Sequence, residues 1–244
     1  MSAVKYLPMI AALLAFTACG GDTAPRQPGE HAFTFERAVT KTVGLQVHLY
    51  LPEGYDAASD RAWPLILFLH GAGERGDDLE MVKIHGFRKM FRGRPDFPFI
   101  LVSPLCPAES WWTERLDDLS ALLDEVTASY NVDASRIYLT GLSMGGQGAW
   151  YLALRDPDRF AAVAPICGWS IPYLGCKLKG LPVWAFHGGR DQVVPPAQSR
   201  LMVAAVNECG GNARLTLYPE AGHDAWTATY TAPQLYDWFL THSR

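Results

Sequence analysis

The sequence predicts an α/β fold with a mainly parallel eight-stranded sheet flanked by helices. Three observations lead to this prediction. Short, apolar, β-prone runs alternate with segments of helical periodicity, which indicates parallel strands covered on both faces. The run 64–69 is continuously apolar, as expected for a strand buried on both sides. Within 136–154, an apolar run, a glycine-rich turn and a helical segment follow one another directly.

The N-terminal residues differ from this body and are predicted to be a signal peptide at 1–18 and a tether at 19–30, ahead of a catalytic domain at 31–244. Lys5 precedes an almost wholly apolar run, 7–18, that is short for a membrane span. Residues 16–19 resemble a bacterial lipobox, which implies lipid on Cys19. Phe16 replaces the usual leucine, so ordinary signal-peptidase cleavage remains an alternative. An exported protein is expected, either a periplasmic or outer-membrane lipoprotein or a secreted one, and lipid on Cys19 is its only expected membrane anchor.

The expected strands and helices alternate through the rest of the chain. The strands are 33–40 and 45–51, as an antiparallel pair, then 64–69, 99–103, 136–140, 160–166, 183–186 and 215–218. The helices are 79–90, 116–130, 146–154, 196–208 and 233–242. The helix at 116–130 has a clear apolar stripe on one face. The connection 167–181 is too short for a large lid, so an open site is expected.

Composition restricts the class of protein. The chain has 244 residues, of which 49% are hydrophobic and 19% charged, which suits one globular domain with a sizeable core. The formal net charge is −4, and no basic stripe stands out, so no nucleic-acid partner is expected.

Four cysteines besides Cys19 allow three disulfide connectivities. Cys106 and Cys167 follow expected strands, whereas Cys176 precedes one and Cys209 ends a helix. The last two therefore fall at the same edge of the sheet, and Cys176–Cys209 is the preferred bridge. The alternative is that all four are small buried hydrophobic residues.

Residues Gly141-Leu142-Ser143-Met144-Gly145 match G-x-S-x-G between a predicted strand and a predicted helix. This is the nucleophile elbow of α/β-hydrolases, in which a strained turn exposes the serine hydroxyl above the sheet. Ser143 is therefore the expected nucleophile. The glycines around it allow neighbouring backbone to approach closely.

A serine hydroxyl needs a base to take its proton, and that base must be oriented by an acid. After the nucleophile, Asp191 follows the strand 183–186 and His223 follows the strand 215–218, in the chain order that this fold requires. His223 is the expected base and Asp191 the expected acid. His187 is a weaker candidate, because it precedes the acid, and is expected to be a hydrogen-bonded turn residue.

Two backbone N–H groups are expected to form the oxyanion hole. One belongs to Met144, directly after the nucleophile, and the other to Ala72 in the glycine-rich loop 70–76, with Gly71 as the alternative. Trp112 and Trp226 follow strands at the same edge and are expected to line the substrate pocket, although core packing remains possible for them.

Four segments resemble small secreted serine esterases grouped with dienelactone-hydrolase-like and "predicted peptidase" α/β-hydrolases. The segments are 69–76, 140–146, 185–191 and 218–226. The resemblance implies an acyl-enzyme on Ser143 and no metal or cofactor. Dienelactone hydrolases proper use a cysteine where this chain has Ser143.

The expected function is therefore carboxylic-ester hydrolysis on a small-molecule or polymer-attached ester. A feruloyl or acetyl xylan esterase acting on plant polysaccharide is the alternative, and a serine peptidase a lesser one, since peptidases of this fold usually add a gating domain. A non-catalytic envelope protein on the same scaffold is the third hypothesis.

Overall fold

The computed structural model describes residues 30, 32, 34 and 36–244. The chain divides into two units, Met1–Lys41 and Thr42–Arg244. The predicted signal peptide lies outside the described residues, as does the tether up to residue 29. The described residues of the first unit are exposed and form no helix or strand, so the strand expected at 33–40 is wrong for residues 34 and 36–40, which the structure describes.

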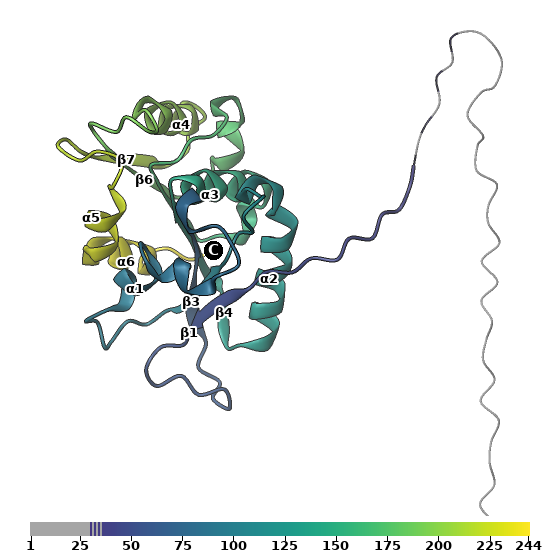
Figure 1. Cartoon of the computed structure of the whole chain (residues 1–244), viewed down its shortest axis with the longest axis vertical. Helices are drawn as coiled ribbons and strands as arrows, with labels where there is room; N and C mark the ends of the chain where they lie inside the picture. Colours follow the sequence, from purple (N-terminus) through teal and green to yellow (C-terminus); the bar gives the residue numbers. More distant parts are fainter. Residues whose placement is uncertain (1–29, 31, 33, 35) are drawn as a thin grey trace, which may run out of the picture. The chain divides into compact units, whose positions relative to one another are not determined.

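The second unit is built on a seven-stranded sheet with the order β1-β3-β2-β4-β5-β6-β7 (Figure 1). The strands are β1 (Val47–Tyr50), β2 (Trp63–Leu69), β3 (Ile100–Pro104), β4 (Val132–Leu142), β5 (Ala162–Ile166), β6 (Val183–Gly188) and β7 (Ala213–Tyr218). All neighbouring pairs are parallel except β1 and β3. The mainly parallel sheet is confirmed, with seven strands among the described residues instead of the expected eight.

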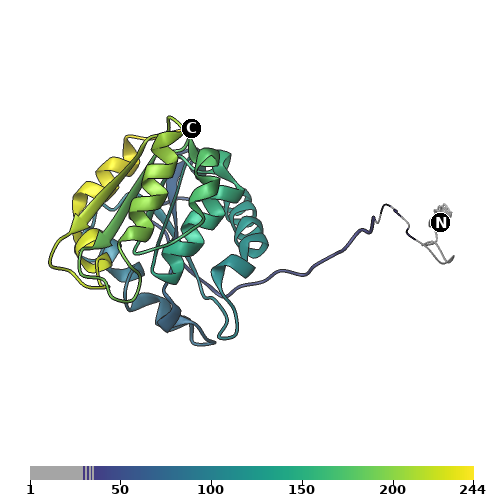
Figure 2. The same cartoon turned by 90° about the horizontal axis from the view of Figure 1, so that it is seen from above.

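Helices cover both faces of the sheet (Figure 2). They are α1 (Phe87–Phe91), α2 (Leu116–Ser129), α3 (Met144–Arg155), α4 (Ala197–Glu208), α5 (Trp226–Thr231) and α6 (Pro233–Leu240). Alternate side chains of β2 supply the two cores: Leu65 and Leu67 pack with α2, α3 and α4, whereas Ile66 and Phe68 pack with α1, α5 and α6. A continuously apolar strand is needed because both of its faces are covered.

The helix expected at 79–90 is broken into a 3₁₀ turn, η2 (Leu79–Lys83), and the short helix α1. Gly86 lies between them, and a Cβ there would be 2.0 Å from the ring of Phe68. The chain therefore crosses the face of the sheet with backbone directly against this ring. Helix α5 was not expected from the sequence.

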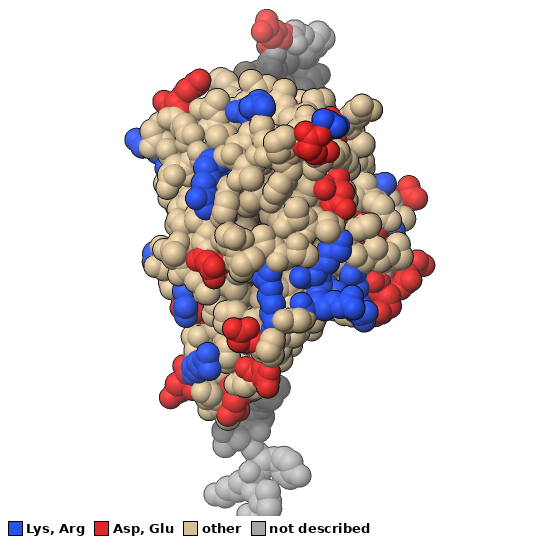
Figure 3. All heavy atoms as spheres, turned by 90° about the vertical axis from the view of Figure 1, so that its left-hand side faces the viewer, with Lys and Arg blue, Asp and Glu red and all other residues tan. Residues whose placement is uncertain are grey.

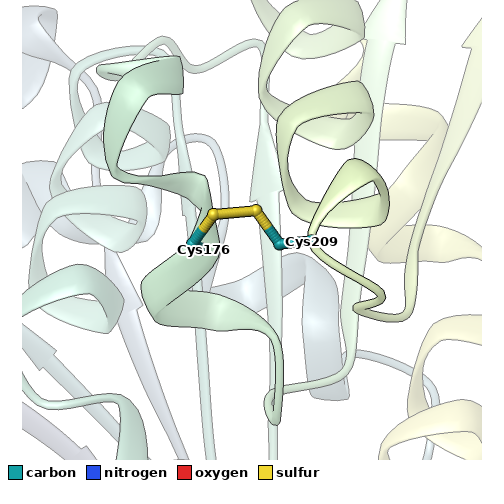
Figure 4. Close-up of a disulfide and its surroundings, with 2 residues drawn as sticks. All are labelled: Cys176 and Cys209. Carbon is teal, nitrogen blue, oxygen red and sulfur yellow. A yellow bond between two sulfur atoms is a disulfide. The ribbon is translucent and has the colours of Figure 1, made fainter.

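The only disulfide in the described part of the chain joins Cys176 and Cys209, as preferred from the sequence (Figure 4). Cys176 lies in the 3₁₀ segment η5 (Pro172–Leu178), and Cys209 caps the C-terminus of α4, with Cα atoms 5.2 Å apart. Cys106 and Cys167 are free and buried.

The parallel order brings the C-terminal ends of β2, β4, β6 and β7 to one edge of the sheet. The loops that follow these strands carry the expected functional residues, and this is the edge at which open α/β sheets bind ligands. Among the helices that the structure describes, none is both long and apolar enough to cross a membrane.

Candidate active site

Ser143 occupies a sharp turn between β4 and α3. Its backbone has φ 54° and ψ −115°, a region that residues with a side chain rarely adopt. The Ser143 N–H donates to the carbonyl oxygen of Ile166 at 2.9 Å, and its own carbonyl accepts from the N–H of Gln147 at 2.9 Å. The turn is thus fixed by the neighbouring strand and by the first turn of α3.

Glycines permit this turn because backbone approaches them too closely for a side chain. A Cβ on Gly145 would be 1.9 Å from the carbonyl oxygen of Leu69, and one on Gly146 would be 2.4 Å from that of Ile166. Helix α3 therefore begins directly against the ends of β2 and β5, as the elbow motif predicts.

The structure brings the three expected catalytic side chains together. The Ser143 hydroxyl lies 2.9 Å from Nε2 of His223, and Nδ1 of His223 lies 2.7 Å from Oδ2 of Asp191. With the proton on Nδ1, the imidazole donates to Asp191, and Nε2 is free to accept the hydroxyl proton of Ser143. The chain of contacts matches a nucleophile, a base and an orienting acid.

Asp191 is held as a carboxylate by its surroundings. Its side chain is fully buried, and burial alone would raise its pKa. Hydrogen bonds from His223 and from the N–H groups of Val194 and Val193 outweigh burial and lower the pKa of Asp191 below its usual value. The acid therefore remains ionised and keeps the imidazole of His223 in one orientation.

His187 supports this acid from within the fold. It is fully buried, with Nδ1 2.7 Å from the Ser199 hydroxyl and Nε2 donating to the carbonyl oxygen of Val194 at 2.9 Å. Burial lowers the pKa of His187, which keeps the ring neutral beside Asp191. It is hydrogen-bonded, as expected, but it lies in β6 and not in a turn.

The glycine-rich loop after β2 is anchored through His70. Nδ1 of this buried ring donates to the carbonyl oxygen of Gly71 at 2.7 Å, and Nε2 accepts from the N–H of Cys106 at 2.9 Å. The loop continues as the 3₁₀ turn η1 (Ala72–Glu74). Ala72 and Met144 each begin a helical turn, where backbone N–H groups have no partner within the helix. The role of these two N–H groups as the oxyanion hole stays a prediction.

The two expected pocket tryptophans have different environments. Trp112 is fully buried, and its Nε1 donates to the carbonyl oxygen of His70 at 2.9 Å. Trp112 therefore packs inside the fold against the loop that begins at His70. Because it has no exposed surface, the prediction that it lines the pocket is wrong. Its neighbour Trp111 is 37% exposed, stacks under the guanidinium of Arg75, and meets the ring of Trp169 edge-on at 6.5 Å. An exposed aromatic surface near the loop therefore comes from Trp111 and Trp169.

Trp226 contacts the expected base directly. Its ring lies edge-on to His223 at 5.2 Å and to His85 at 5.9 Å. His85 in turn lies 3.4 Å from the buried carboxylate of Glu74 in η1. This cluster of Glu74, His85 and Trp226 joins the glycine-rich loop to the loop of His223. Sequence reasoning did not assign Glu74 or His85 to this contact, because they lie far from His223 along the chain.

Cys167 lies with Asp191 and His223 in a group whose candidate ligand atoms are all within 4.8 Å of one another. The group is a poor metal site. Burial raises the pKa of the Cys167 thiol to about 12, and its Sγ donates to the carbonyl oxygen of His223. Both nitrogens of His223 are already engaged by Ser143 and Asp191. Catalysis without metal or cofactor remains a prediction from the resemblance.

Residues 108–235, which include Ser143, Asp191 and His223, match the model of the dienelactone hydrolase family. The chain belongs to the dienelactone hydrolase family. Among solved structures, this family member is similar to a thermostable esterase, with a TM-score of 0.77 and 33% identity, over 88% of this chain and 63% of that one.

Two curated relatives add to this likeness. Feruloyl esterase C from Emericella nidulans is 28% identical over 199 residues, which are 78% of this chain and 70% of the relative. The bifunctional acetylxylan esterase/xylanase XynS20E from Neocallimastix patriciarum is 25% identical over 154 residues, which are 62% of this chain and 22% of the relative. This member of the dienelactone hydrolase family thus spans only about a fifth of XynS20E and less than two thirds of the thermostable esterase.

Proposed function

We propose that this protein is a serine carboxylesterase. The observation that carries the proposal is the continuous hydrogen-bonded chain from Ser143 through His223 to Asp191, on an elbow in the strained conformation. Related proteins named as esterases, including one with the same fold at 33% identity, support it.

The geometry supports a two-step reaction. In the first step, Oγ of Ser143 attacks the ester carbonyl carbon while Nε2 of His223 takes the hydroxyl proton. The carbon–oxygen bond to the alcohol then breaks, and the alcohol leaves with that proton, giving an acyl-enzyme. In the second step, water repeats the attack with His223 as base, releasing the carboxylic acid and restoring Ser143.

The negative charge on the tetrahedral oxygen is stabilised by the N–H groups of Ala72 and Met144. Removing one such donor typically costs about 10²–10³ in rate. Ala72 gains its position from the anchored His70 and from Trp112 below it. The ionised Asp191 stabilises the imidazolium that forms in each step.

Hydrolysis of p-nitrophenyl esters from acetate to laurate by the wild type and by Ser143→Ala tests this function. We expect turnover by the wild type and a loss of about 10⁴-fold or more in the variant. Turnover that persists in Ser143→Ala would refute the proposal. Absence of turnover on every chain length, with the fold intact, would favour the non-catalytic binding protein.

A feruloyl or acetyl xylan esterase is the more specific candidate. The exposed Trp111 beside Trp169 favours it, because aromatic faces suit both phenolic acids and sugars. The names of the two curated relatives point to the same substrates. Comparing methyl ferulate and acetylated xylan with aryl acetates decides this point, and no activity on sugar-linked esters would argue against it.

We further propose that the protein is exported. The apolar N-terminal run followed by Cys19 supports export, and so does the bridge between Cys176 and Cys209, since disulfides persist in oxidising compartments. Lipid on Cys19 would anchor it to a membrane. Intact-mass measurement of the protein isolated from its source distinguishes a lipidated Cys19 from a cleaved, unmodified N-terminus.

A further inference from the structure

The segment 81–95 concentrates positive charge in a chain of net charge −4. It contains no acidic residue and five basic ones: Lys83, Arg88, Lys89, Arg92 and Arg94. We call these residues the α1 basic cluster. The five are spaced irregularly along the chain and only Arg88 and Lys89 lie in α1, so they form no regular basic stripe in the sequence. In Figure 3, which faces the side where Figure 1 labels α1, α5 and α6, basic side chains gather below the middle of the surface.

Most of this cluster is not neutralised within the described part of the chain. Only Lys83 contacts a carboxylate, that of Glu80. The ammonium of Lys89 donates to the hydroxyl of Thr227, and the guanidinium of Arg94 donates to the carbonyl oxygen of Thr231. Elsewhere, guanidinium–carboxylate contacts are frequent, and at least one is made by each of Arg115, Arg136, Arg155, Arg159 and Arg190.

Part of the cluster lines a surface hollow between β1 and the end of α1. The hollow has a volume of about 430 Å³, and its walls include Tyr50, Phe91, Arg92 and Arg94, with Glu53 as its one acidic residue. The rings of Tyr50 and Phe91 stack at 4.2 Å. Arg94 is fixed, because its guanidinium also lies over the ring of Tyr236 at 4.4 Å. Arg92 is exposed.

These walls have the chemistry of a site for an acidic sugar. Guanidinium groups bind carboxylates through paired, charge-assisted hydrogen bonds. Aromatic rings give apolar contact to the C–H face of a ring-shaped ligand. The volume falls within the range of small-molecule sites, roughly 300–1,000 Å³. The hollow is shallow and open, which leaves room for one sugar unit of a longer chain.

The hollow is connected to the candidate active site through α1 and α5. Lys89 contacts Thr227, and the preceding residue, Trp226, lies against the ring of His223. Arg92 follows Lys89 by three residues, which is about 4.5 Å along a helix axis. Because β1 runs antiparallel to β3 and the hollow lies at the end of β1, the hollow is toward the opposite edge of the sheet from Ser143. A polymer chain bound at both places would therefore extend along α1.

We propose that the hollow binds an acidic sugar unit of the same polysaccharide chain that carries the scissile ester. The inference rests on the proposed esterase function and names its substrate class: an esterified polysaccharide that contains uronic acids. Arg92 binds the sugar carboxylate, and the fixed Arg94 adds positive charge beside it. Tyr50 and Phe91 contact the sugar ring, and Glu53 lowers the affinity by repelling the same carboxylate.

Calorimetric titration of the inactive Ser143→Ala protein with an oligogalacturonate tests the site. Its methyl-esterified form is the matched neutral probe. We expect salt-sensitive binding of the acidic probe only. Arg92→Gln should weaken it by about tenfold, since a charge-assisted hydrogen bond is lost. Glu53→Gln should strengthen it severalfold. Arg200→Gln, an exposed arginine on α4, should leave it unchanged.

The outcomes separate the two proposals. Equal binding of the neutral probe, or unchanged binding in both Arg92→Gln and Glu53→Gln, overturns the site. Binding to anionic vesicles or to an oligonucleotide, without binding to the oligogalacturonate, also overturns it. Hydrolysis of p-nitrophenyl acetate by proteins that retain Ser143 is measured separately: its absence refutes the esterase, whereas its retention in Arg92→Gln shows that the hollow acts on the polymer alone.

Discussion

Glu74 is a buried carboxylate in the loop that carries Ala72. Burial raises its pKa, and the nearby His85 opposes that rise. Oε1 lies 3.4 Å from His85, Oε2 lies 3.8 Å from His70, and Oε2 has no hydrogen-bond partner within the described residues. Glu74 is the last residue of η1 and contacts His70 and His85, so we expect it to position the loop without touching the reacting atoms.

Replacing Glu74 with Ala should therefore lower kcat more than it changes KM. Displacing the Ala72 N–H donor by about 1 Å lowers the rate by up to ~10²-fold. We therefore expect a loss of about 10–100-fold in kcat on p-nitrophenyl acetate. Glu80→Ala removes an exposed acid from the same stretch of chain and is the control. Equal kcat values for wild type and Glu74→Ala would show that η1 is positioned without this side chain.

The buried His70 makes the free energy of unfolding depend on pH. Burial lowers its pKa to about 4, whereas an unfolded histidine titrates near 6.5. Below pH 6.5 the unfolded chain takes up a proton that the folded His70 does not, so the free energy of unfolding falls as pH drops toward 4. The expected loss from this residue is about 3 kcal/mol.

Urea unfolding at pH 7.5, 5.5 and 4 measures this dependence. The buried His187 and the ionised Asp191 act in the same direction, since the pKa of each is lowered in the folded state. For Asp191 the loss comes at still lower pH, as the solution passes below the usual carboxyl pKa toward the folded one. A free energy of unfolding that stays constant from pH 7.5 to 4 would contradict this account.

At the scale of elements, the junction of β4 and α3 depends on glycine. Gly145→Ala would place a Cβ 1.9 Å from the carbonyl oxygen of Leu69, which is backbone and does not move aside easily. Overpacking of this kind costs about 3 kcal/mol, which corresponds to a fall in Tm of about 6–12 °C for a domain of this size.

Gly73→Ala is the matched control, because no heavy atom lies within 4 Å of a Cβ at that position. Its Tm should stay within about 2 °C of the wild type, as for an ordinary surface change. If both alanine variants melt at the same temperature, the close packing of α3 on β2 does not determine stability.

The elements that sequence patterns predicted well are those with strong local signals. The elbow at Ser143 and the strands that precede Asp191 and His223 combine an apolar strand with glycine-rich turns, and the structure brings these three residues into hydrogen-bonding contact. The helix at 79–90 was predicted as continuous because its break depends on Gly86 packing on Phe68, a contact between residues 18 apart.

Contacts that depend on the tertiary fold could not be predicted from the local sequence. Trp112 and Trp226 follow strands in the same way, but one packs under His70 and the other beside His223. Nothing in their local sequence distinguishes them. The hollow beside α1 was missed for a similar reason, since it combines Tyr50 from β1 with Arg92 from the end of a short helix.

At the scale of the whole domain, one disulfide ties the segment after β5 to the end of α4. Cys176 and Cys209 are 33 residues apart in the chain. Closing a loop of that length stabilises the folded state by about 3–4 kcal/mol in the chain-entropy model. The bridge lies at the opposite edge of the sheet from Ser143.

The double variant Cys176→Ser/Cys209→Ser should thus lose stability without losing catalytic rate. We expect a fall of about 3 kcal/mol in the free energy of unfolding and an unchanged kcat at 25 °C. Urea unfolding and turnover of p-nitrophenyl acetate measure the two quantities on the same protein. A large fall in kcat in protein that is still folded would show that this edge is coupled to the candidate active site.

The central claim is that Ser143 is the nucleophile activated by His223. Incubation with a p-nitrophenyl alkylphosphonate tests it most directly, because Oγ displaces p-nitrophenolate from phosphorus and keeps the phosphonyl group. The account predicts one equivalent of p-nitrophenolate, one added phosphonyl mass on the peptide that contains Ser143, and no label in Ser143→Ala or His223→Ala. Label on another residue, or ester hydrolysis that continues in protein without a reactive Ser143, would contradict it.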